Sequence, residues 1–300
     1  MPFNLDESIA EIDRLSRNEN LSDDMVCALM SIYLSLSNMA VVIQSVEESE
    51  ETRYYRQAIE RLSNICEHRC VDNQSIERRC RMTSILYQSF DAPDTMLDER
   101  KYVRCVERMY QILSEWRKGQ QEESSHHSDM QNKYQYGILR CIVEVYADVI
   151  EEDKQSDEDF LYLKGIISDW SNELLPSGRW IGLSDREAML RLDIMTRYSN
   201  LHSDDRYEAE ISKASRYYSS RITGNAESDG QTIYHLYQTL TSGLVSEEIT
   251  VDRVVSLAAR KSEAYSERSE DRLWCLAVCI DRESVRIIRD VKLRLIAQSA

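Results

Sequence analysis

Soft metal ligands gather in one short stretch of the sequence, which contains Cys66, His68, Cys70 and Cys80. A structural zinc site surrounds the ion with four nitrogen or sulfur ligands. On a helix Cys66 and Cys70 share a face, because they are four residues apart, and Cys80 could approach from the next helix. His68 points to another face. The stretch admits a zinc site or cysteines that fill a core as small hydrophobes, and we expect core packing.

A second candidate for chemistry is the acidic cluster of Asp204, Asp205 and Glu208. Its spacing resembles the DDxx[DE] motif with which all-α terpenoid synthases hold magnesium on a substrate diphosphate. The resemblance implies an enzyme with a central helical cavity. However, the cluster follows Ser203 at a predicted helix start, where the positive end of the helix dipole favours acidic side chains. We expect helix capping here, and no catalytic residue or cofactor is predicted.

Two sets of residues are candidates for binding a protein partner. The first set is Tyr217, Tyr234 and Tyr237, because tyrosine side chains are common anchors in binding grooves. The second set is Arg282, Arg286 and Arg289, which share one face of the last predicted helix. Both sets have a structural alternative, in which the tyrosines fill the core and the arginines form a solvated face. A neighbouring apolar face of the same helix is expected to pack inward, and its members are Val285, Ile288, Val291 and Leu295.

The charge of the chain restricts its partners. The net charge is −16, which argues against direct binding to nucleic-acid phosphates or to a membrane surface. Residues 1–50 contain ten acids and two bases, whereas residues 251–300 contain eight acids and ten bases. Oppositely charged ends allow a head-to-tail homo-oligomer. An acidic inhibitor that mimics nucleic acid is a further alternative.

The scarcity of chain breakers determines the fold class. Only eight glycines and three prolines occur in 300 residues, against roughly 12% in an average protein. Sheets need such residues for their frequent turns. Apolar residues instead recur at three- and four-residue spacing almost throughout the chain, which is typical of helices. The sequence therefore predicts an all-α protein.

About thirteen helices are expected, and they include 5–17, 23–46, 50–69, 185–201, 204–222, 230–244, 247–266, 270–280 and 283–298. A sequence ending in Trp116 recurs in degenerate form ending at Trp170. This repeat predicts about six stacked αα-hairpins, which resemble tetratricopeptide and HEAT-like solenoids without their consensus residues. The array is either an open superhelix or a closed α/α ring. Residues 1–300 form a single array, with a possible division into 1–118 and 131–300 across the polar segment 119–130.

The expected function follows from this architecture alone. Helical-repeat arrays present an extended concave surface, and the sequence therefore favours a non-catalytic scaffold or adaptor that binds a protein or peptide. The alternative is an enzyme with a central helical cavity. Because no secretory signal is recognised and the cysteines fit buried helix faces, we expect a cytoplasmic protein with reduced thiols.

Overall fold

The computed structural model describes residues 3–18, 20–44, 50–72, 182–202, 207–224, 228–241, 250–266 and 269–299, with a few isolated positions between 79 and 180. The helices with described bounds are α1 (Leu5–Ser16), α2 (Asp23–Gln44), α3 (Glu50–Asp72), α8 (Asp185–His202), α9 (Glu208–Gly224), α10 (Gly230–Thr241), α11 (Val251–Ala264) and α12 (Glu270–Ser299). No strand occurs among the described residues. The prediction of an all-α protein is confirmed.

Local capping signals account for several helix starts. The Ser184 hydroxyl accepts a hydrogen bond from the Glu187 amide at 3.3 Å, and the Glu187 carboxylate accepts from the Ser184 amide at 2.8 Å. This reciprocal pair is a capping box, and it begins α8 where the sequence predicted. Asn4 caps α1 in a similar way, because its side chain accepts from the Glu7 amide. The predicted cap at Ser203 lies outside the described residues.

Helix α2 is largely apolar, and most of it lies in the core. Residues 26–30 are consecutive and all buried, as expected for a helix that is surrounded by other helices. The segment Asp23–Ile43 is long and apolar enough to cross a membrane by length and composition, with a mean hydropathy of 2.0. Within the structure 61% of it is buried, because α3 and α12 pack against it. The core helix of a soluble protein can have the same length and apolar composition.

Helix α12 is one continuous helix of 30 residues. The prediction of two helices, 270–280 and 283–298, is wrong, because Asp281 and Arg282 continue the helix. An aspartate often ends a helix by bonding to nearby backbone groups. Here the Asp281 carboxylate instead accepts hydrogen bonds from Ser35 on α2 and Tyr237 on α10, so it does not compete for the local backbone.

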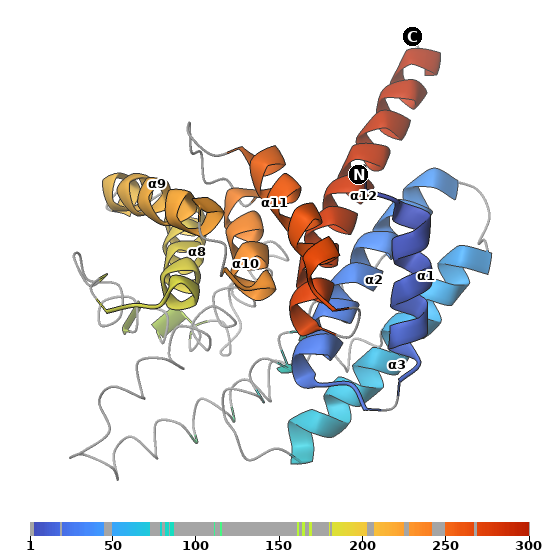
Figure 1. The fold of residues 1–300 in the computed structure, drawn as a ribbon, viewed down its shortest axis with the longest axis horizontal. Coiled ribbons are helices and arrows are strands. Elements are labelled where there is room, and N and C mark those ends of the chain that lie inside the picture. The colour runs from blue at the N-terminus through green and yellow to red at the C-terminus, as the bar shows by residue number, and fades with distance from the viewer. Residues whose placement is uncertain are drawn as a thin grey trace.

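The second half of α12 differs from the sequence prediction in its packing. Ile288 packs against the core as expected, whereas Val285 and Leu295 are exposed. Figure 1 shows that the C-terminal end of α12 extends past the neighbouring helices, which accounts for the exposure of Leu295, whereas Val285 lies on a face of α12 that is not covered. Helical periodicity predicts which side chains share a face, but the length of the neighbours determines how much of that face is covered.

Helix α12 also joins the two ends of the chain. It packs against α2 and α1 on one side and against α10 and α11 on the other, and α8 and α9 lie beyond α10 (Figure 1). In an open array each hairpin contacts only its sequence neighbours. The stacked-hairpin arrangement and the division at 119–130 remain predictions, because Trp116, Trp170 and the connecting segment lie outside the described residues.

Candidate functional site

A polar cavity of about 210 Å³ lies where α2, α8, α10 and α12 meet. Each helix contributes at least one polar side chain to its wall. The residues most important for its chemistry are Ser35, Arg197, Tyr234, Tyr237 and Asp281. The sequence analysis selected the two tyrosines but missed the other three. A signal for Asp281 was present, because it lies seven residues after Trp274 and four after Ala277 on an otherwise apolar helix face.

The Asp281 carboxylate is held by two neutral hydroxyl groups. Ser35 donates to Oδ1 at 2.7 Å, and Tyr237 donates to Oδ2 at 2.6 Å. Burial, together with the negative charge of Asp281, raises the pKa of the Tyr237 phenol above its usual range. Tyr237 therefore remains a hydrogen-bond donor at physiological pH. The guanidinium of Arg282, the next residue, pairs with Asp252 on α11 at 2.8 Å.

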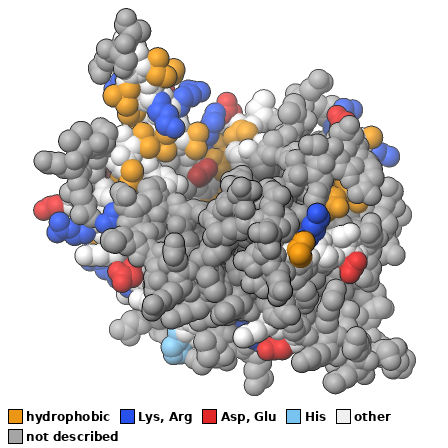
Figure 2. All heavy atoms as spheres, turned by 180° about the vertical axis from the view of Figure 1, so that it is seen from behind, with side chains coloured by type: hydrophobic (Ala, Val, Ile, Leu, Met, Phe, Trp, Pro, Cys, Tyr) orange, Lys and Arg blue, Asp and Glu red, His pale blue; other side chains and the backbone are white. Residues whose placement is uncertain are grey.

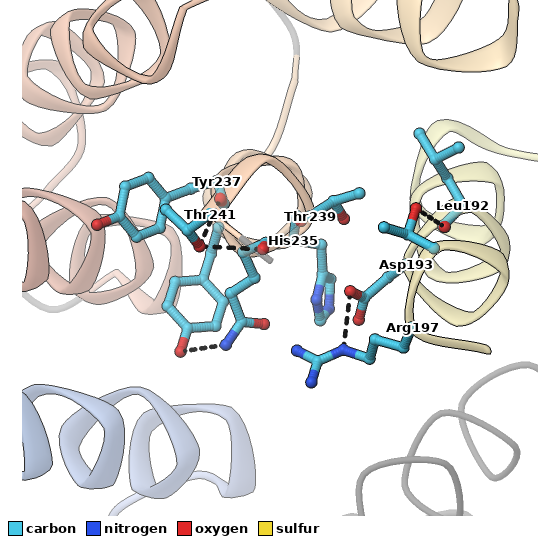
Figure 3. Close-up of polar contacts among 10 residues, drawn as sticks. Leu192, Asp193, Arg197, His235, Tyr237, Thr239 and Thr241 are labelled. Atoms are coloured by element: carbon cyan, nitrogen blue, oxygen red, sulfur yellow. Dashed lines mark hydrogen bonds and ion pairs between the residues drawn. The ribbon is translucent and has the colours of Figure 1, made fainter. Parts of the chain in front are cut away.

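A second group of polar contacts lies between α10 and α8 (Figure 3). The Arg197 Nε donates to Asp193 Oδ1 at 3.0 Å, and both residues come from α8. His235 is buried and faces this pair from α10, whereas Tyr237 points to the other side of α10, toward α12. The Gln238 amide donates to the Tyr234 hydroxyl at 2.9 Å. The two groups place a carboxylate and an ion pair on different walls of one cavity.

The three candidate tyrosines lie in different surroundings. Tyr217 on α9 is exposed, with 59% of its surface accessible, and its ring meets that of Tyr218 edge to face. Tyr234 and Tyr237 are buried on α10, and the Tyr234 ring packs against Trp274 with 4.7 Å between centroids. These two tyrosines line the cavity and do not lie with Tyr217 in an open groove.

The three candidate arginines lie along α12, and each has an acidic neighbour. Arg282 pairs with Asp252, Arg286 binds Glu283 at 2.5 Å and Asp290 at 3.2 Å, and Arg289 lies 3.9 Å from Asp290. The hydrogen bond from Arg286 lowers the pKa of Glu283 and raises that of Arg286, while partial burial of Glu283 opposes the first shift. The arginine face is therefore a network of exposed pairs, which water and salt screen.

The cysteine candidates do not come together in the described part of the chain. Cys66 is buried in the core, whereas Cys80 and the side chain of Cys70 lie outside the described residues. Among the described residues no group of three or more His, Cys, Asp or Glu side chains is placed to hold a metal. The polar pair Asp204 and Asp205 also lies outside them, and Glu208 is exposed in the first turn of α9.

The buried thiols lead to a prediction about reactivity. Burial raises the pKa of Cys275 well above its usual range and that of Cys279 to about 12. Because the thiolate is the reactive form, we expect both residues to resist iodoacetamide at pH 8 in the native protein and to react fully in guanidinium chloride. Peptide mass spectrometry measures the labelled fraction at each position. Rapid labelling of native Cys275 would contradict its burial.

Both oxygens of Asp281 and the Nε of Arg197 are engaged by protein groups at the cavity. No protein-family model, no curated protein and no solved structure matches this chain.

Proposed function

We propose that this protein is a non-catalytic adaptor that binds an acidic partner protein through the exposed end of α12. The observation that carries the proposal is a docking surface formed by Val285, Arg289, Lys292, Leu293 and Ile296. These residues recur at the spacing of a helix face that recognises a partner. Leu293 and Ile296 expose 58% and 66% of their surfaces.

The shape of the molecule supports this proposal. Hydrophobic and basic side chains lie side by side on the protruding end of α12, at the top left of Figure 2. Single exposed apolar residues are common on soluble proteins, but several on one face mark an interaction site. Burying them against a partner would recover roughly 25 cal/mol per Å² of apolar surface.

The charge of α12 indicates the chemistry of the partner. Residues 282–296 carry five basic and two acidic side chains, in a chain whose net charge is −16. An acidic surface with apolar residues at its centre complements this segment, because opposite charges speed association and exclude cationic competitors. The acidic first fifty residues of a second copy offer the same sign of charge. The crosslinking experiment below can therefore also detect binding to a second copy of this chain.

Site-specific photo-crosslinking in cells that express the protein tests the proposal. A photo-reactive phenylalanine analogue replaces Leu293 in the full-length chain, and a matched control carries it at Tyr217, an equally exposed position on α9. We expect the probe at position 293 to capture an acidic protein that the probe at position 217 does not capture. The captured protein is then purified and its affinity for the unmodified chain is measured.

The affinity measurement uses a variant that introduces a negative charge into the α12 surface. We expect Leu293→Glu to weaken binding at least tenfold, because it removes apolar contact and places a negative charge against an acidic partner, at a cost of about 1.4 kcal/mol or more. Tyr217→Glu should change the affinity less than twofold. If both variants lose the same amount of affinity, the proposal that the partner binds the α12 surface is wrong. If only a second copy of this chain is captured, the α12 surface mediates self-association and does not bind a different protein.

The architecture and location belong to the same proposal. The contact of α2 with α12 supports a ring in which the two ends of the chain meet, in place of an open superhelix. The enzyme alternative needs a larger cavity than the one of about 210 Å³ that the described residues form among α2, α8, α10 and α12, because common ligand sites have roughly 300–1,000 Å³. The mimicry alternative needs acids spaced like phosphates. A cytoplasmic location is consistent with the buried thiols.

A further inference from the structure

A carboxylate with only neutral partners faces the cavity between α2, α8, α10 and α12. Asp281 accepts hydrogen bonds from Ser35 and Tyr237, and among the described residues no cation pairs with it. We propose that this cavity binds a small primary alkylammonium ion, whose positive nitrogen lies against Asp281. This binding site is separate from the α12 docking surface and does not depend on the proposed function.

The first argument is the unbalanced charge. Asp281 is partly buried, and a carboxylate in such surroundings attracts a cation more strongly than it does in bulk water. Each Asp281 oxygen accepts one hydrogen bond from a hydroxyl group, and a carboxylate has about four acceptor positions. About two positions therefore remain for N–H donors. A primary ammonium group has three such donors and supplies the missing positive charge.

The second argument is that the described residues lining the cavity supply no positive charge next to Asp281. Burial raises the pKa of the Tyr237 phenol, so Tyr237 stays neutral and donates to Asp281 without supplying a positive charge. Arg197 lines the same cavity, but its guanidinium is bound by Asp193 at 3.0 Å on the α8 wall. Arg282 is turned toward Asp252 on α11. Arg197 and Arg282 each have another carboxylate as a partner, and neither forms an ion pair with Asp281.

The third argument concerns the size and the apolar wall of the site. The cavity volume of about 210 Å³ is small, which favours a ligand with an alkyl chain of a few carbons. Ala277 on α12 and the rings of Tyr234 and Tyr237 form the apolar part of the wall. Tyrosine faces attract cations. The net charge of −16 raises the local concentration of cations around the whole molecule.

Isothermal titration calorimetry of the full-length protein with butylammonium chloride tests the proposal. We expect saturable binding at one site, with a Kd below about 1 mM. Tetramethylammonium has the same charge but no N–H donor, and it should bind at least tenfold more weakly. Absence of saturable butylammonium binding to the wild-type protein overturns the proposal. Equal binding of tetramethylammonium also overturns it, because the ligand class would then be defined by charge alone.

Two variants place the binding at this cavity. Asp281→Asn removes the charge and keeps the shape, and we expect at least a tenfold loss of butylammonium affinity. The matched control is Asp290→Asn, which removes an exposed carboxylate from the same helix and should change the affinity less than twofold. Ala277→Val fills the cavity without altering a charge and should also weaken binding at least tenfold. Circular dichroism verifies that each variant is folded. If the folded Ala277→Val variant binds butylammonium as tightly as the wild-type protein, the ligand does not bind in this cavity.

Discussion

Replacing Gly230 with alanine is expected to lower the free energy of unfolding by about 3 kcal/mol or more, because overpacking against backbone has little room to relax. Gly230 is the first residue of α10, and its amide donates to the Asp271 side chain at 2.8 Å. A Cβ atom here would lie 2.7 Å from both the Cα and the carbonyl carbon of Asp271, and closer still to its oxygen. The substitution must therefore push α10 away from α12.

The control for this prediction is Gly224→Ala at the end of α9. A Cβ atom at Gly224 meets nothing within 4 Å, so alanine should change stability by less than about 1 kcal/mol, and in the stabilising direction through helix propensity. Urea denaturation of both variants gives the two free energies. If Gly230→Ala unfolds at the same urea concentration as the wild-type protein, the close approach of α10 to α12 is wrong.

Replacing Arg272 with alanine is expected to cost about 3–5 kcal/mol, the range for breaking a buried ion pair from one side. The guanidinium binds both oxygens of Glu11 on α1, at 2.6 and 2.7 Å, and both side chains are largely buried. It also donates to the Ser262 and Tyr265 carbonyls at the end of α11. One side chain thus connects α12 to α1 and to α11. Without it, the Glu11 carboxylate stays largely buried but loses the guanidinium that binds both of its oxygens.

The matched control is Arg286→Ala on the same helix, where the ion pairs are exposed and should contribute much less to stability. Thermal or urea unfolding compares the two variants. A double-mutant cycle with Glu11→Ala separates the pair from the carbonyl contacts, because the coupling energy belongs to the pair. A loss for Arg272→Ala no larger than for Arg286→Ala would contradict the connection between the chain ends.

The sequence alone was sufficient for features that arise within one or two turns of chain. The scarcity of glycine and proline determined the all-α class, and the spacing of apolar residues located the helix over 23–46 that is α2 in the structure. The Ser184 capping box placed the start of α8, because its two hydrogen bonds span only three residues. Such interactions depend on local spacing, and spacing is read directly from the residues.

The tertiary structure was needed wherever the partner of a side chain is far away in the sequence. Asp281 was expected at a helix break, and it is instead held within α12 by Ser35, which is 246 residues earlier. Val285 was expected in the core and is exposed, although Ile288, one turn further along α12, packs against the core. Periodicity defines the faces of a helix, but which face is covered, and by what, depends on how helices distant in sequence pack together.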